Sequence, residues 1–597
     1  MLHPIRKPLN FSEDRLFGVG PIPAIRLLNR TAPWFLAALI VLICAALITR
    51  TVWFLDRGFD FTDDSFYLMT IQRPSDYKWN YGLFGYALKP LFGLAGESIA
   101  GLRRIGALIL VGLGAAIGLI VLNKAKLSWR GPAGMQVLAV CAALPLCYYA
   151  LWLTSPSYNW LALVGALLLF IAILLLHPPG TTSYSAVCAA MAGAVAALGR
   201  PHGVLSFGVI YLAAVLLMLP TMKARLTQII RAAGAGILVI AIVALFLPID
   251  AIFSQIKEYN TIFGTSHPVN FSVLDRQVAF LAQGKTWFLS VLMFVAVLFM
   301  RRGGRNIPNL LTLLLFAAAL AIVFAATLSQ LLHPREYDFG IKATAVAFSV
   351  LTLCCLRTTV DIRLITLLAL AALIPSAATA GSSNTVSLTF AQLFGLSIAG
   401  AFAAFVLAFE KSTTAIAAAS AVALCLAFSG FNFGLTSPYR LAGPLAMQVV
   451  PTPVGWGSEL KLDRKTSEFI EALRNTTKAG GFCKGGLAID LSGSSPGLVF
   501  VIDGQMPVFP WIFGGYSISD HFAQEYFRRL QPDHLKQSWL FTRSSGSFSI
   551  EELQALGVDF AAYRLASELR YPVDDSLVKI YAPLQPAACP AGQDNGR

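Results

Sequence analysis

Residues 33–55 read PWFLAALIVLICAALITRTVWFL, and this stretch decides the class of fold. Arg50 is its single charged side chain. A helix of about 20 mostly apolar residues crosses a hydrocarbon core about 30 Å thick. The stretch is long enough to span a bilayer and lacks a small-residue cleavage site. We therefore expect it to remain in the membrane as a signal anchor.

Apolar runs of similar length recur as far as residue 431. The chain is 56% hydrophobic and 13% charged, with a mean hydropathy of +0.67, whereas soluble domains carry about 25% charged residues. We predict an α-helical polytopic membrane protein with about thirteen spans. The expected spans are residues 33–55, 100–122, 133–153, 159–177, 183–200, 203–220, 232–253, 286–301, 307–328, 340–356, 363–380, 386–409 and 413–431.

Charge in the connections predicts the orientation. Lys and Arg cluster on alternate connections, at residues 6–30, 124–130, 223–231, 301–305 and 357–363. The positive-inside rule places these clusters and the N-terminus in the cytoplasm. Loops 56–99, 254–285 and 329–342 are acidic or mixed, so we expect them on the outer side of the cytoplasmic (inner) membrane. Retention of basic loops explains the net charge of +14, and no nucleic-acid partner follows from it.

Composition changes after about residue 432. We expect residues 1–432 to form the transmembrane domain and 433–597 a soluble α/β domain on the periplasmic or extracellular side. A Pro- and Gly-rich linker is expected at 438–456. Within the domain, the patterns predict helices at 464–478, 524–535 and 549–557, and strands at 486–493 (GLAIDLSG), 497–504 (GLVFVIDG), 558–564 and 576–583.

The cysteines add one expectation. All but two of the nine fall inside expected spans, where they behave as small hydrophobic residues. The two exceptions, Cys483 and Cys589, are both in the C-terminal domain. In an oxidising compartment they would form a disulfide.

Ionisable groups near a bilayer are costly to bury and mark candidate sites. Loop 56–99 carries Asp60, Asp63 and Asp64 just after the first span. The pair Asp63-Asp64 opens the stretch SFYLM, which is amphipathic enough to lie in the membrane interface. Two interpretations stay open: acids stabilised at a helix N-terminus by the macrodipole, or reactive carboxylates held at the membrane surface.

Other loops expected on the outer side supply cations and metal-binding groups next to Pro or Gly. They are Lys89 in YALKPLF, Arg200 and His202 in LGRPHGVL, and His333, Arg335 and Glu336 in LLHPREYDFGIK. Snorkelling or loop packing would explain any one of them. Their convergence on one face favours a site for a phosphate headgroup. In transfer from a lipid phosphate, a carboxylate takes the acceptor's proton while cations stabilise the leaving phosphate.

These features resemble the GT-C superfamily of membrane glycosyltransferases, which use polyprenyl-phosphate-linked sugars and include the protein mannosyltransferases and the aminoarabinose transferase. Asp63-Asp64 followed by Phe66-Tyr67 is similar to the family's acidic pair and Tyr in the first outside loop. Lys89-Pro90 is similar to a Lys-Pro element of the aminoarabinose transferase branch. The sequence departs from many members in having Asp64 rather than Glu. It also lacks a Trp-Trp-Asp motif, which disfavours transfer of a whole oligosaccharide to Asn.

The resemblance implies transfer of a single sugar from a polyprenyl-phosphate donor to a glycan, lipid or protein acceptor, as in cell-envelope and cell-wall biosynthesis. It implies that Asp63 is the general base, with Asp64 and Asp60 as the next candidates. The implied donor-phosphate ligands are Lys89, Arg200, Arg335 and His202. A divalent metal, Mg or Mn, would be held with the help of His333 and Glu336.

Two other functions stay open. A transporter or flippase of a lipid-linked or anionic substrate would carry internal repeats and ionisable groups at mid-membrane, and neither is evident in the sequence. A protein of the O-antigen polymerase or ligase type would rely on Arg and His in a large outside loop rather than on carboxylates beside the first span.

Overall fold

The computed structural model describes residues 23–77, 79, 82–176, 182–248, 386–408, 412–515 and 519–585, with isolated positions between 253 and 378. Within this part of the chain, nine helices are long and apolar enough to cross a membrane. Each coincides with an expected span. The spans expected at 286–301, 307–328, 340–356 and 363–380 lie outside the described residues, apart from isolated positions in the last. The total of about thirteen spans therefore stays a prediction.

The spanning helices begin and end close to the predicted residues. They are α1 (Pro23–Phe54), α4 (Ile99–Ala125), α5 (Pro132–Ala143) continued by the 3-10 helix η2 (Leu144–Leu151), α6 (Tyr158–Leu176), α7 (Thr182–Gly199), α8 (Pro201–Met218), α9 (Met222–Phe246), α16 (Val386–Ala408) and α17 (Thr413–Thr436). The start differs most at α1 and α9, which both begin ten residues before the expected spans at 33 and 232. The end of α9 also falls seven residues before the expected residue 253. The helix α9 begins earlier because the Thr221 side chain accepts a hydrogen bond from the Ala224 N–H and caps the helix.

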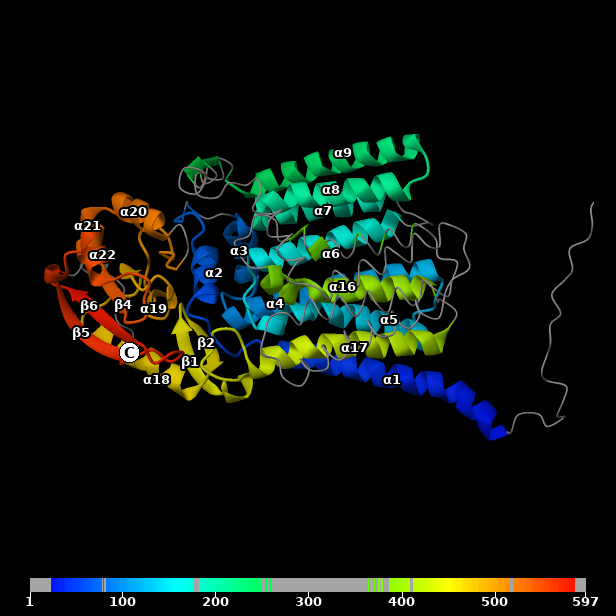
Figure 1. Cartoon of the computed structure of the whole chain (residues 1–597), viewed down its shortest axis with the longest axis horizontal. Coiled ribbons are helices and arrows are strands. Elements are labelled where there is room, and N and C mark those ends of the chain that lie inside the picture. Colours follow the sequence, from blue (N-terminus) through cyan, green and yellow to red (C-terminus); the bar gives the residue numbers. More distant parts are fainter. Residues whose placement is uncertain are drawn as a thin grey trace, which may run out of the picture.

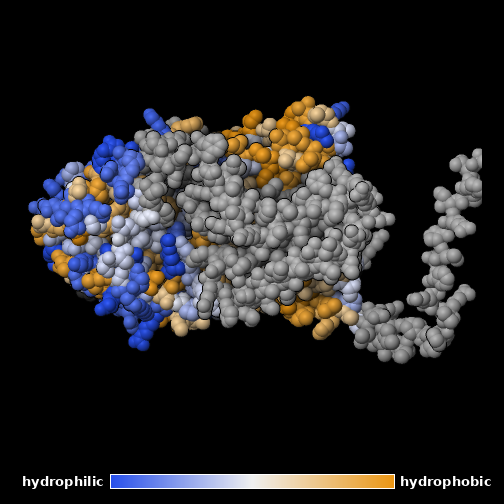
Figure 2. All heavy atoms as spheres, viewed as in Figure 1, coloured by the Kyte–Doolittle hydropathy of each residue, from blue (hydrophilic) through white to orange (hydrophobic). Residues whose placement is uncertain are grey.

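The surface of these helices is what a multi-pass membrane protein requires. Large apolar side chains such as Leu205 on α8 and Ile237 and Phe246 on α9 are exposed. In the space-filling view, apolar surface covers α8 and α9, whereas polar surface dominates the C-terminal domain (Figure 2). Lipid tails can cover such side chains, because their contact with hydrocarbon costs nothing relative to a protein core.

The C-terminal domain contains a hairpin and a four-stranded sheet with short helices around them. Its elements are the 3-10 helix η3 (Leu445–Met447), β1 (Val450–Gly455), β2 (Ser458–Leu462), α18 (Arg464–Ala479), β3 (Ala488–Asp490), α19 (Gly497–Phe500), α20 (Ser519–Arg529), α21 (Pro532–Gln537), β4 (Trp539–Arg543), α22 (Ile550–Ala555), the 3-10 helix η4 (Phe560–Ala562), β5 (Tyr563–Arg570) and β6 (Leu577–Pro583). The sheet order is β3-β4-β6-β5, with β3 and β4 parallel and the other pairs antiparallel.

Three sequence expectations for this domain were wrong. The strand expected at 558–564 begins only at Tyr563, because residues 560–562 form η4. The run at 497–504 was expected to be a strand, but residues 497–500 form α19, which is buried on every side. A short run that is apolar throughout cannot distinguish a buried strand from a buried helix. The second half of the expected linker, 438–456, forms β1. Its Pro451 and Pro453 lie at exposed positions of a two-stranded hairpin, where a missing N–H is tolerated.

The 56–99 segment lies between the helical bundle and the C-terminal domain (Figure 1). It contains α2 (Asp63–Gln72) and α3 (Phe84–Leu94). We expected the start of α2 to lie in the membrane interface, which was wrong, because residues 64–71 are all buried. The helical bundle covers some of them, such as Asp64 and Tyr67, and the C-terminal domain covers others. The Phe66 ring, for example, lies 5.7 Å from Phe509 and 5.8 Å from Trp511, measured between ring centroids.

Residues 56–61 pair with and pack against the C-terminal domain. The Lys461 N–H on β2 donates to the Asp56 carbonyl at 2.8 Å, and the Gly58 N–H donates to the Lys461 carbonyl at 3.0 Å. The chain before α2 therefore pairs with the edge of the β1–β2 hairpin. Burying an edge strand in this way removes unpaired backbone groups from solvent.

Aromatic side chains from the same residues complete the core of that domain. The Phe59 ring stacks on Phe500 at 5.6 Å, and the Phe61 ring meets Phe469 at 5.8 Å and Tyr571 at 5.6 Å. Phe59 and Phe61 are 2% and 1% exposed. Full burial of each is worth roughly 1.5–3 kcal/mol. The two domains thus share one core at this junction.

Gly497 lies at a tight point of the junction, and its substitution tests the packing. Its N–H donates to the Phe61 carbonyl at 2.7 Å, and an added Cβ would stand 2.6 Å from the Phe61 Cα. We expect Gly497→Ala to lower the free energy of unfolding by roughly 1–3 kcal/mol, because backbone must move. The measurement is thermal unfolding in detergent. Gly443→Ala is the control, since its Cβ would meet only the Met447 sulfur at 3.5 Å. Equal midpoints for the two variants would contradict the packing described here.

Candidate active site

Asp60 organises the start of α2. Its Oδ1 accepts a hydrogen bond from the Thr62 N–H at 3.0 Å, and its Oδ2 accepts one from the Asp63 N–H at 2.7 Å. The Asp60 carbonyl accepts a further bond from the Ser65 hydroxyl at 2.9 Å. Unpaired N–H groups at a helix start need such partners. Asp60, which is 3% exposed, thus binds the N–H groups of Thr62, the N-cap residue, and of Asp63, the first residue of the helix.

Asp64 forms a buried ion pair. Arg103 Nη2 donates to Asp64 Oδ2 at 2.9 Å, and the two side chains are 0% and 3% exposed. The other Asp64 oxygen accepts the Ser155 N–H at 3.2 Å. The remaining Arg103 nitrogens donate to the carbonyls of Leu55 and Gly58 and to the Ser155 hydroxyl. Asp64 and Arg103 thus tie the 56–99 segment to α4 and to the connection between η2 and α6.

Asp63 differs from its two neighbours because solvent reaches its side chain. Arg440 Nη1 donates to Asp63 Oδ2 at 3.1 Å, and the two side chains are 39% and 17% exposed. The Tyr67 hydroxyl donates to Asp63 Oδ1 at 3.4 Å. A hydrogen bond from the Tyr439 hydroxyl also reaches this carboxylate. Asp63 is therefore held in place by partners that are themselves neutral or partly exposed.

Crowding of the three carboxylates changes their acidity. Burial raises the pKa of Asp60 to about 7; the Asp63 charge adds to the rise, and Arg440 opposes it. Burial likewise raises the pKa of Asp63, with the Arg440 charge opposing the rise and the Asp64 charge adding to it. Removing a carboxylate from water disfavours its charged form, and like charges nearby add to that cost. Both groups therefore hold a proton more readily than an ordinary Asp.

A chain of hydrogen bonds links Asp63 to Arg200. The Asn159 amide donates to the Tyr67 hydroxyl at 3.3 Å, and Arg200 Nη2 donates to the Asn159 side-chain oxygen. Arg200 Nη1 donates to the carbonyl of Ala378 at 2.9 Å, and the guanidinium carbon lies 5.1 Å from the Tyr158 ring centroid. Arg200 is 2% exposed. The structure thus brings two of the predicted residues, Asp63 and Arg200, into one network.

The other predicted residues are placed as follows. Lys89 is exposed on α3, and His202 is half-buried in the first turn of α8, two residues after Arg200. The predicted residues that lie outside the described part of the chain are His333, Arg335, Glu336 and Cys589. Cys483 is disulfide-bonded. Its pairing with Cys589 stays a prediction.

A metal site is not formed by the described residues. Among them, no group of three or more His, Cys, Asp or Glu side chains is arranged to hold a metal ion. The predicted metal ligands His333 and Glu336 lie outside the described part of the chain, so the prediction of Mg or Mn stays open.

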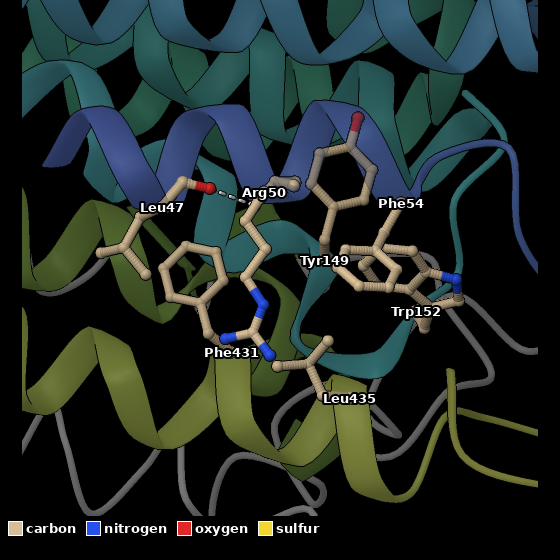
Figure 3. A pocket seen from close by; sticks show the side chains of 8 residues that line it. Leu47, Arg50, Phe54, Tyr149, Trp152, Phe431 and Leu435 are labelled. Carbon is tan, nitrogen blue, oxygen red and sulfur yellow. Dashed lines mark hydrogen bonds between the residues drawn. The ribbon is translucent and has the colours of Figure 1, made fainter. Parts of the chain in front are cut away.

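A pocket lies apart from the carboxylates, between α1, η2 and α17 (Figure 3). The Arg50 side chain points into it, toward Phe431 and Leu435, and is the single cation of its lining. The dashed line in the figure is the bond from the Thr51 hydroxyl to the Leu47 carbonyl, at 2.8 Å. An Arg near the end of a span lays its stem on apolar surface and turns its charge toward the headgroups. Snorkelling explains Arg50 without a functional role.

Several residues of the site were not predicted from the sequence. Arg440 falls in the segment SPYRLAG, which we assigned to the linker, and Arg103 falls inside an apolar span. An Arg in the second turn of a spanning helix is itself a signal, because it demands buried partners. Asn159 gave no signal, since a single amide at a helix start is common.

Comparison of the chain with protein-family models, with curated proteins and with solved structures found no match.

Removing the acid of the buried ion pair tests its structural role. In Asp64→Asn the Arg103 charge stays buried without a counter-charge, which typically costs about 3–5 kcal/mol. We expect a lower midpoint of thermal unfolding in detergent. The matched variant is Asp56→Asn, whose pair with Lys461 is partly exposed at 2.8 Å and should be worth at most about 1 kcal/mol. A similar midpoint for both variants would show that the Arg103 pair does not hold the segment.

The hydrogen bond from Arg200 to Asn159 leads to a second prediction. Asn159→Leu keeps the number of side-chain heavy atoms but leaves a buried guanidinium N–H without its acceptor, so we expect a loss of roughly 1.5–3 kcal/mol. Tyr67→Phe removes the 3.4 Å bond to the Asp63 carboxylate and the 3.3 Å bond from the Asn159 amide. Both are long for hydrogen bonds, so their loss should cost about 0.5–1.5 kcal/mol. Thermal unfolding of both variants shows which of the two loses more stability. The reverse order would mean that Arg200 is satisfied by other partners.

Proposed function

We propose that this protein is a GT-C-type membrane glycosyltransferase. It moves a single sugar from a polyprenyl-phosphate donor to an acceptor hydroxyl at the outer face of the cytoplasmic membrane. Asp63 is the general base that takes the proton of the acceptor. The acceptor is a glycan, a lipid or a protein of the cell envelope.

The observation that carries the proposal is that the three carboxylates differ in their contacts and in their exposure. Asp60 accepts hydrogen bonds from two backbone N–H groups at the start of α2. Asp64 forms the buried ion pair with Arg103. Asp63 alone of the three is partly exposed, at 17% of its side chain. It is also the residue that the family resemblance assigns as the base.

The acidity of Asp63 supports this role. Burial raises its pKa above that of an ordinary Asp. A general base works best when its pKa approaches the working pH, because a stronger base takes the proton more completely. Two tyrosine hydroxyls, of Tyr67 and Tyr439, fix the orientation of the carboxylate, which reduces the reorganisation needed during reaction.

The reaction balances with these groups. The bond between the anomeric carbon and the phosphate oxygen breaks, and a bond forms between that carbon and the acceptor oxygen. The acceptor's proton passes to the Asp63 carboxylate. The electron pair of the broken bond leaves with the polyprenyl phosphate, which gains one negative charge. The departing phosphate needs cations rather than an acid.

Replacing Asp63 tests the proposal. We expect Asp63→Asn to lower sugar transfer by roughly 10²–10⁴-fold, the usual contribution of a general base. The assay supplies purified protein in lipid with a panel of polyprenyl-phosphate sugars and measures donor consumption. Asp76→Asn serves as the control, since its carboxylate lies in the same segment but is 53% exposed, in a 3.9 Å contact with Arg73.

The outcomes separate the candidate functions. If the folded Asp63→Asn variant turns over normally, Asp63 is structural and the assignment of the base fails. If wild type consumes no donor, the glycosyltransferase proposal fails, and transport of a lipid-linked substrate across vesicles is measured instead. Transfer that survives Asp63→Asn but is lost on replacing Arg and His of the other loops would favour the O-antigen polymerase or ligase type.

A further inference from the structure

The cation that touches Asp63 is not one of those predicted from the sequence. Arg440 lies between α17 and the C-terminal domain, and its guanidinium is 39% exposed. Arg103 and Arg200, by contrast, are 0% and 2% exposed and donate to carbonyl and side-chain oxygens inside the protein. Of these three arginines around the carboxylates, Arg440 is the one that an incoming ligand can reach.

The backbone presents Arg440 to Asp63 in a fixed conformation. Its φ of 52° lies in the left-handed region, which is uncommon for Arg. The preceding residue is anchored, since the Tyr439 N–H donates to the Leu151 carbonyl at 3.0 Å. The guanidinium carbon lies 4.7 Å from the Tyr439 ring centroid. Such a conformation persists only where its surroundings determine it, and it is typical of functional sites.

The contact between Arg440 and Asp63 conflicts with the role of Asp63 as a base. A carboxylate that accepts a charge-assisted hydrogen bond is a weaker base than a free one. A guanidinium also binds phosphate, whose oxygens match its fork of N–H groups. A phosphate placed at Asp63 would therefore compete with the carboxylate for Arg440.

We propose that Arg440 is a ligand of the lipid-linked phosphate and exchanges its ion pair with Asp63 for one with the donor. The exchange rests on the proposed function, because it concerns the same site. Before the donor binds, Arg440 masks the base. After binding, Arg440 neutralises the phosphate that will leave, and Asp63 is released to take the acceptor's proton. One cation thus couples donor binding to activation of the base.

The surroundings of Asp63 fit this exchange. Among the residues that the structure describes, the charged or titratable groups that act on Asp63 are Asp64 and Tyr67 of α2 and Tyr439 and Arg440 of the connecting segment. Asp60 also belongs to the cluster, since its acidity depends on the Asp63 charge. Arg440 is the single cation among them. Its departure to the phosphate therefore leaves an excess of negative charge around Asp63, which favours uptake of a proton.

The test measures binding of polyprenyl phosphate and of the matching polyprenol, which lacks the phosphate, to the full-length protein in nanodiscs. We expect Arg440→Gln to weaken binding of the phosphate by roughly 10–100-fold and to leave binding of the polyprenol unchanged. Arg440→Lys should restore part of the loss. The control is Arg104→Gln, which removes a cation of similar exposure (45%) in a 3.9 Å contact with Asp56.

A double-mutant cycle tests the competition itself. Asp63→Asn removes the carboxylate that holds Arg440, so we expect this variant to bind polyprenyl phosphate several-fold more tightly than wild type while losing transfer. In the Arg440→Gln background the same change should bring no gain. A fixed partner of Asp63 that never meets the phosphate would alter transfer without this coupling.

The outcomes distinguish this inference from the function on which it depends. If wild type transfers sugar but Arg440→Gln binds the phosphate as tightly as wild type, the exchange is wrong and the glycosyltransferase stands. If Asp63→Asn tightens binding equally with and without Arg440, general repulsion explains the gain and the exchange is again wrong. If wild type prefers polyprenyl phosphate no more than polyprenol, both proposals fall.

Discussion

A guanidinium buried at the end of a spanning helix must satisfy every N–H group, since no water reaches it. Arg103 meets this demand with the Asp64 carboxylate, the Ser155 hydroxyl and backbone carbonyls that include those of Leu55 and Gly58. These partners come from three separate parts of the chain. By satisfying Arg103, they fix the turn after α1, the start of α2 and the connection into α6. Asp63 is adjacent to Asp64 in α2, so the same constraint fixes where Asp63 stands.

The site contains two ion pairs that differ in exposure to solvent, and their acids, Asp63 and Asp64, are adjacent in the sequence. The pair of Asp64 with Arg103 is dry, and its charges have no exposed surface to offer a ligand. The pair of Asp63 with Arg440 is reached by solvent. A dry pair is costly to break, whereas a partly exposed pair is worth little and can be exchanged. This contrast separates the residue that holds the site from the residue proposed to react.

The sequence predicted what depends on local pattern. Apolar runs located each spanning helix that the structure describes, because length and hydropathy are properties of a segment alone. The sequence also predicted the helix α18 and the strands β3 and β6. Where a run is apolar throughout, as at 497–500, the pattern does not tell helix from strand. Contacts between parts of the chain that are distant in sequence could not be predicted from local pattern. The bond from Arg440 to Asp63 joins residues 377 positions apart, and no spacing rule links a residue in an apparent linker to a carboxylate after the first span.

The junction at residues 56–61 also bears on how the chain is made. Phe59 and Phe61 leave the ribosome long before Phe500 and Tyr571, yet their rings share one core. The C-terminal domain, which is synthesised after the membrane domain, can complete its core only against a segment that the membrane domain has already positioned. Contacts of such high sequence separation form late and slowly. Until then, the apolar surface that contacts the two rings and the free edge of β2 stay open to other chains, so exposure to aggregation is concentrated in the step that joins the two domains.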